Sequence, residues 1–114
     1  MKPNFPVQIA MLLVLSALAA CRTPSPRETV RSARALWAQN KEAAACAQVR
    51  ELAPDGIAGW PRATAWEWLR LSALCAVHGG RPLPAAVAGL RAPFGPYARA
   101  MVHFYDQRPG EARR

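Results

Sequence analysis

The chain begins with a short apolar segment that limits how much sequence is left to fold. Residues 7–19 are apolar except for Gln8 and Ser16, Lys2 provides a positive start, and Ala20 precedes Cys21. A membrane-spanning helix needs about 20 apolar residues, whereas this run is shorter and has the pattern of a secretory signal peptide. Of the 114 residues, the remainder is enough for one small domain and excludes a TIM barrel or a full dinucleotide-binding fold.

The end of this segment, Leu18-Ala19-Ala20-Cys21, resembles the lipobox of bacterial lipoproteins. A positive start, an apolar run, small residues and a Cys follow one another in the order that this family uses for export. The resemblance implies a diacylglycerol on the Cys21 thiol, cleavage before Cys21 and acylation of the new amine. Two or three acyl chains would hold the protein on a membrane almost permanently. The alternatives are an ordinary signal peptide with a chance Cys and an uncleaved anchor.

The residues after Cys21 predict a very short tether followed by a helix. Arg22 takes the place where an Asp signals inner-membrane retention in enteric-type lipoproteins, so the resemblance implies the periplasmic face of the outer membrane. Ser25-Pro26-Arg27-Glu28 combines an N-cap Ser, a Pro at the first helical position and a Glu three residues after the cap. We therefore expect a signal peptide at 1–20, a lipidated Cys and tether at 21–25, a small helical domain at 26–107 and a basic tail at 108–114.

Apolar residues recur at helical spacing through most of the remaining sequence, and strand signals are nearly absent. Pro54, Gly59 and the pair Gly79-Gly80 mark loops and stops. The chain is predicted to be all-α, with four or five short helices in a small bundle or helical-hairpin array. The expected helices are Pro26 to about Gln39, Glu42 to Leu52, Pro61 to about His78 as the central helix, Pro84 to about Leu90, and Pro96 to about Asp106.

Two cysteines remain after Cys21, and their even number predicts a disulfide between Cys46 and Cys75 if the protein is exported. In the chain-entropy description, closing the loop between them stabilises the fold by roughly 3–4 kcal/mol. Two buried free thiols are the alternative. No CxxC motif is present, and His78 and His103 stand at no metal-ligand spacing from either Cys, so no metal site and no cofactor are expected.

The chain is basic, with a formal net charge of +8, and cleavage would remove one positive charge with Lys2. The arginines are spread along the whole sequence without a dense stripe, and export argues against a nucleic-acid partner. Those closest to the anchor could contact anionic lipid headgroups, at about 1 kcal/mol each. This membrane-surface group comprises Arg22, Arg27, Arg31 and Arg34.

No grouping of a nucleophile, a base and an orienting residue is evident, so the chain is not expected to be an enzyme. Ser25 is explained as a cap, Ser32 and Ser72 lie inside predicted helices, and no nucleophile elbow or P-loop occurs. The carboxylates are scattered; Glu67 and Arg70 predict a surface ion pair at i, i+3.

Aromatic residues give the main hint of a binding function. Trp60, Trp66 and Trp68 fall close together, and residues at i and i+2 of a helix face different ways, so one of Trp66 and Trp68 should be partly exposed. A partly exposed Trp is a typical anchor for a protein partner. Both are therefore candidate partner-binding residues.

Two further resemblances concern helical character. The stretch Glu42 to Pro54, EAAACAQVRELAP, resembles the second helix of a tetratricopeptide repeat, although no second copy follows. In size, anchor and helix content the protein is similar to the pilotins, small lipoproteins that escort secretion subunits to the outer membrane. We expect a non-catalytic factor that binds an unidentified envelope protein, for assembly or in a pilotin-like role. The alternative is a structural envelope lipoprotein that contacts anionic lipid and has no dedicated partner.

Overall fold

The computed structural model describes residues 23–112, and within them every regular element is helical. The predicted all-α class is confirmed, with no strand in this part of the chain. Cys21 and Arg22 lie outside the described residues. The elements are α2 (Pro26–Ala38), α3 (Glu42–Glu51), the 3-10 helix η1 (Pro54–Gly59), α4 (Arg62–Gly79), α5 (Ala85–Ala88), α6 (Phe94–Gln107) and α7 (Pro109–Ala112).

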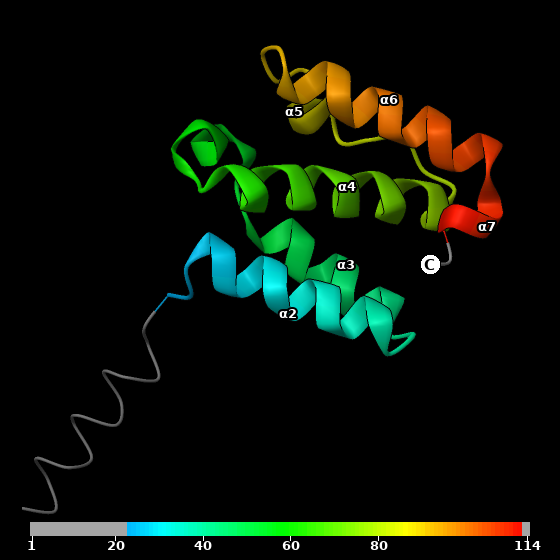
Figure 1. Cartoon of the computed structure of the whole chain (residues 1–114), viewed down its shortest axis with the longest axis horizontal. Coiled ribbons are helices and arrows are strands. Elements are labelled where there is room, and N and C mark those ends of the chain that lie inside the picture. Colours follow the sequence, from blue (N-terminus) through cyan, green and yellow to red (C-terminus); the bar gives the residue numbers. More distant parts are fainter. Residues whose placement is uncertain (1–22, 113–114) are drawn as a thin grey trace, which may run out of the picture.

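Helix α4 lies in the middle of the molecule, as the sequence predicts for this segment. Figure 1 shows α2 and α3 as a hairpin on one side of α4, and α5 and α6 on the opposite side. The chain thus forms three layers of helices, and α4 is covered on both sides. This explains why its apolar residues occupy several faces instead of a single stripe.

Local sequence signals set the ends of these helices. The Ser25 hydroxyl accepts a hydrogen bond of 3.2 Å from the backbone N–H of Glu28, which confirms the predicted N-cap of α2. Asn40 has a φ of 60° in the turn between α2 and α3, a conformation that Asn tolerates better than most residues. Gly80 ends α4 with a φ of 61°, as expected for a glycine stop.

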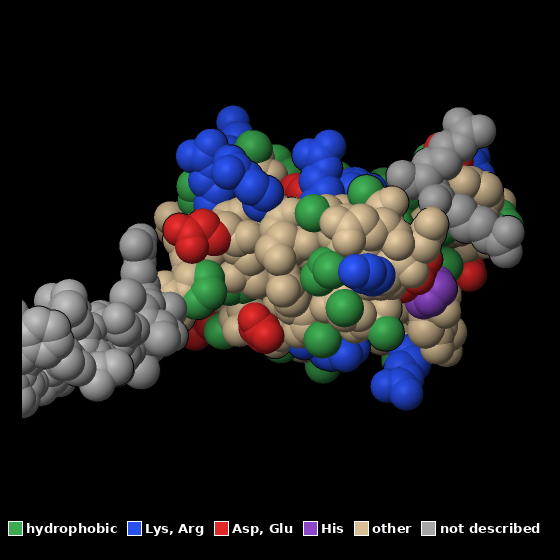
Figure 2. Space-filling model, turned by 90° about the horizontal axis from the view of Figure 1, so that it is seen from below, with side chains coloured by type: hydrophobic (Ala, Val, Ile, Leu, Met, Phe, Trp, Pro, Cys, Tyr) green, Lys and Arg blue, Asp and Glu red, His purple; other side chains and the backbone are tan. Residues whose placement is uncertain are grey.

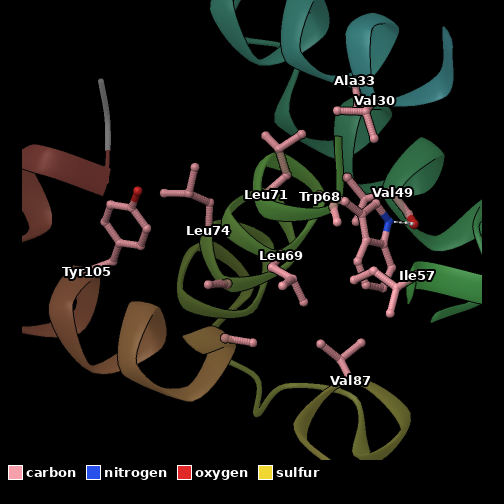
Figure 3. Close-up of a cluster of buried hydrophobic side chains, with 13 residues drawn as sticks. Val30, Ala33, Val49, Ile57, Trp68, Leu69, Leu71, Leu74, Val87 and Tyr105 are labelled. Atoms are coloured by element: carbon pink, nitrogen blue, oxygen red, sulfur yellow. Dashed lines mark hydrogen bonds between the residues drawn. The ribbon is translucent and has the colours of Figure 1, made fainter. Parts of the chain in front are cut away.

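The core is formed by side chains from all the longer helices around α4 (Figure 3). Leu69, Leu71 and Leu74 of α4 are its largest fully buried side chains. Val30 of α2 and Tyr105 of α6 mark its two ends along the sequence, so the core closes within residues 30–105. Residues 23–112 therefore contain one complete core together with the caps and helices that cover it, which is the property of a domain that can fold by itself.

A disulfide joins Cys46 of α3 to Cys75 of α4, with 5.7 Å between the two Cα atoms and a sequence separation of 29 residues. The predicted pairing is confirmed. Because α3 is one arm of the α2–α3 hairpin, the bond links that hairpin covalently to the central helix α4.

The beginning of α6 differs from the prediction. The helix starts at Phe94 and not at Pro96, because a Pro within the first helical turn needs no N–H and is tolerated there. Gly95 is buried against backbone: a Cβ at this position would lie 2.9 Å from the carbonyl oxygen of Ala88 and closer still to that of Leu90. Only glycine therefore allows the α5 connection to pass this close to α6.

The carboxyl-terminal segment is also more ordered than a basic tail. Residues 109–112 form the short helix α7, and Ala112 packs against the core. Helix α7 contacts both α6 and α4, so the helical domain extends to Ala112.

Candidate partner-binding surface

The two tryptophans that the sequence proposes for partner binding have different environments. Trp68 is a core residue with 2% of its surface exposed, and its indole N–H donates a 2.9 Å hydrogen bond to the Val49 carbonyl oxygen of α3 (Figure 3). Its ring also meets the edge of Trp60, with 5.4 Å between centroids. Trp68 therefore presents no anchor to a partner, and its candidate role is corrected to one in the fold.

Trp66 is the half-buried member of the pair, as expected for residues at i and i+2. Its ring packs against two aromatic rings of α6, Tyr97 at 4.6 Å and Phe94 at 5.7 Å between centroids. These contacts fix the orientation of the indole while part of it stays accessible. A rigid, partly exposed aromatic side chain loses little conformational entropy on binding.

Trp66 contributes to a hollow of about 260 Å³ near the start of α4, which we call the aromatic hollow. Trp60, Trp66 and Phe94 are all half-buried there, and the exposed Arg62 stands among them. The hollow is lined by Ile57, Ala58, Trp60, Arg62, Ala65, Trp66, Pro93 and Phe94. Sequence reasoning missed the contributions of Trp60, Arg62 and Phe94, because η1 and the start of α6 meet only in the folded chain.

The predicted pair of Glu67 and Arg70 is formed on α4, but it is half-buried and not on the open surface. Arg70 Nε lies 3.0 Å from Glu67 Oε2, and the two side chains are 30% and 21% exposed. These hydrogen bonds raise the pKa of Arg70, so the guanidinium stays charged. Burial raises the pKa of nearby Tyr97, with a smaller contribution from Tyr105. A stable ion pair and the neutral phenol of Tyr97 thus lie close to Trp66.

A second, larger hollow runs beside α4 and has a volume of about 390 Å³; we call it the apolar groove. One face of α4 forms its floor, with Trp68, Ser72, Cys75 and Ala76. The Ser72 hydroxyl donates a 2.8 Å hydrogen bond to the Trp68 carbonyl oxygen, which satisfies the polar group on this floor. The end of α3 supplies Val49, Arg50, Leu52 and Pro54, and the connection after α4 supplies Arg81, Pro82, Pro84, Ala86 and Val87.

The proposed membrane-surface arginines that the structure describes lie along α2. Arg27, Arg31 and Arg34 are exposed and occupy positions i, i+4 and i+7, so they share one face of the helix. Arg34 Nε approaches Glu67 Oε1 at 3.9 Å. On the face that Figure 2 shows, Lys and Arg side chains form separated groups, most of them near the edges, and Asp and Glu side chains lie between them.

Three further observations concern residues 23–112 only. No helix in this range is long and apolar enough to cross a membrane. No three His, Cys, Asp or Glu side chains of this range stand close enough together to hold a metal ion. His78 makes an edge contact with Trp37, at 5.8 Å between centroids.

Comparison of the chain with models of protein families, with curated proteins and with solved structures gives no match.

Proposed function

We propose that the protein is an exported lipoprotein, anchored through lipid on Cys21, that binds another envelope protein without catalysing a reaction. The lipobox-like sequence at 18–21 supports the anchor. The disulfide between Cys46 and Cys75 is consistent with an oxidising compartment, because such bonds seldom persist in the cytosol of mesophiles.

The aromatic hollow carries the binding part of this proposal. Binding hot spots are enriched in Trp, Tyr and Arg, and they cluster where aromatic side chains are held rigidly. Trp60, Trp66 and Arg62 fit that composition, and the rings of α6 hold Trp66 in place. The proposed roles are assembly, targeting or stabilisation of an envelope complex, as in the pilotins that the chain resembles in size and helix content.

Two experiments test this proposal separately. Cys21→Ala should abolish palmitate labelling and leave an unprocessed precursor, and normal labelling would refute the anchor. Recovery of a cross-linked partner from envelope extracts should fall at least ten-fold with Trp66→Ala or Arg62→Glu. Trp37→Ala is the matched control, because Trp37 is also half-buried but packs on His78 away from the hollow. Equal recovery with all variants would refute binding through the aromatic hollow.

A second candidate function rests on the arginines of α2. Arg27, Arg31 and Arg34 share an exposed face near the proposed anchor, where they would approach anionic headgroups. A structural lipoprotein of this kind has no dedicated partner. Its signature is a salt-dependent loss of vesicle binding in the triple Gln variant, together with unchanged partner recovery.

A further inference from the structure

The apolar groove has the composition of a site for a small amphiphilic molecule. Its walls are mainly aliphatic and proline surfaces, since the Trp68 indole is almost wholly buried, and the one hydroxyl on its floor is already hydrogen-bonded. Ligand sites are typically concave, mostly apolar and about 300–1,000 Å³ in volume, with a few polar groups that fix the ligand's orientation. At about 390 Å³, the groove falls at the small end of that range.

The charged groups of the groove are both positive. Arg50 and Arg81 are exposed members of its lining, contributed by α3 and by the connection after α4. Among residues 23–112, the ion pairs are made by Arg34 and Arg70, both with Glu67, and neither Arg50 nor Arg81 takes part. A planar guanidinium binds carboxylate and phosphate groups through paired hydrogen bonds. The complementary ligand therefore carries a negative head.

The volume of the groove indicates how long the apolar tail of such a ligand would be. If a methylene occupies about the 30 Å³ that a water molecule takes in the liquid, roughly a dozen methylenes fill the groove. A partner helix is about 10–12 Å in diameter, so a space of about 390 Å³ would take only side chains from one of its faces, whereas a single acyl chain of this length fits whole.

We propose that the apolar groove binds a single acyl chain of about ten to twelve carbons with an anionic carboxylate or phosphate head, and that Arg50 and Arg81 hold the head. Such a chain occurs in free fatty acids and as one tail of a membrane phospholipid. The site is separate from the aromatic hollow and goes beyond the protein-binding function proposed above.

Titration of residues 23–114 with carboxylates of increasing length, below their critical micelle concentrations, tests the tail. Burial of each methylene changes Kd by up to about four-fold, so Kd should fall steeply from six carbons to about twelve and then level off. Dodecyltrimethylammonium, with an equal tail and a positive head, should bind at least ten-fold more weakly than dodecanoate. Equal affinity for the two heads, or no dependence on length, would overturn the proposal.

Matched double variants test whether Arg50 and Arg81 form the binding site of the anionic head. Arg50→Gln with Arg81→Gln should weaken dodecanoate binding about ten-fold. Arg27→Gln with Arg31→Gln removes the same charge from α2 and should leave Kd unchanged. If both double variants weaken binding equally, the effect is one of net charge and the site is refuted.

A blocking variant separates the groove from the rest of the surface. Ala86 is exposed and lines the groove, so Ala86→Trp should fill it and abolish binding while the melting temperature stays unchanged. Ala63→Trp, at an exposed position of α4 outside both hollows, should bind normally. Unchanged dodecanoate binding by Ala86→Trp would refute the site. So would loss of the envelope partner in this variant, because the groove would then hold protein.

Vesicles of phosphatidylglycerol distinguish the two sources of the chain. Extraction of phospholipid into the soluble fraction supports a membrane lipid as the ligand, whereas binding of dodecanoate alone supports a free fatty acid. Trp66→Ala should leave both measurements unchanged, so failure of the protein-binding proposal and failure of this one give different results.

Discussion

Removal of the disulfide should lower the stability of the fold substantially. The bond closes a loop of 29 residues between Cys46 and Cys75. For a loop of this length, the chain-entropy description gives about 3–4 kcal/mol at 25 °C. In a domain of this size each kcal/mol moves the melting temperature by about 4–8 °C. We therefore expect Cys46→Ala with Cys75→Ala to melt about 15–30 °C below the oxidised protein.

The assay is thermal unfolding followed by circular dichroism, with two controls. The reduced wild-type chain should melt close to the double variant, because in both the loss of the cross-link is the main change. Each single Ala variant should lose nearly as much stability as the double one, since either change removes the same bond. A double variant that melts within about 5 °C of the oxidised chain would refute the reasoning. Alkylation of both thiols in the native exported protein would show that the bond does not form there.

Three further predictions concern packing, a buried hydrogen bond and pH. Gly95→Ala should lower the free energy of unfolding in urea by about 1–3 kcal/mol, because the added Cβ meets two backbone carbonyls. Gly59→Ala is the control, since a Cβ there meets nothing within 4 Å and should change stability little. Equal losses in the two variants would contradict the close backbone approach at Gly95. Trp68→Phe should lower the free energy of unfolding by about 2–3 kcal/mol, because the Val49 carbonyl oxygen of α3 loses its hydrogen-bond donor. Trp60→Phe should lower it clearly less in the same assay. Folding raises the pKa of Tyr97, so the folded chain keeps the phenol proton at pH values where the unfolded chain releases it. Stability should therefore fall as the pH rises above about 10. A Tyr97→Phe variant whose stability falls equally steeply would contradict this.

Much of the fold is encoded in local signals that the sequence displays openly. The Ser25 cap and the stop at Gly80 act within a few residues, so their positions follow from the sequence. The start of α6 was not predictable in this way. Pro96 ordinarily marks the first position of a helix, whereas in α6 it is the third residue, after Phe94 and Gly95.

The candidate surfaces were less accessible to sequence reasoning because they combine distant segments. Periodicity indicated that Trp66 and Trp68 face different ways, but not which of them enters the core; the hydrogen bond from Trp68 to α3 decides that. The apolar groove had no sequence signal at all. Arg50 and Arg81 come from different elements, and they line the same groove only after the α2–α3 hairpin packs on α4.

The position of the disulfide also determines how the molecule would respond to a pulling force. A load applied through the amino terminus, as the proposed anchor would transmit it, could peel α2 and the start of α3 from the bundle. The peeling would stop at Cys46, where the cross-link passes tension directly to Cys75. The 29-residue segment between them is then shielded, which shortens the fully stretched chain by roughly 90–100 Å. This shielded segment contains most of the central helix α4, including the α4 residues up to Cys75 that line the two hollows. A tethered protein under a pulling force would therefore keep that part of its binding surface folded.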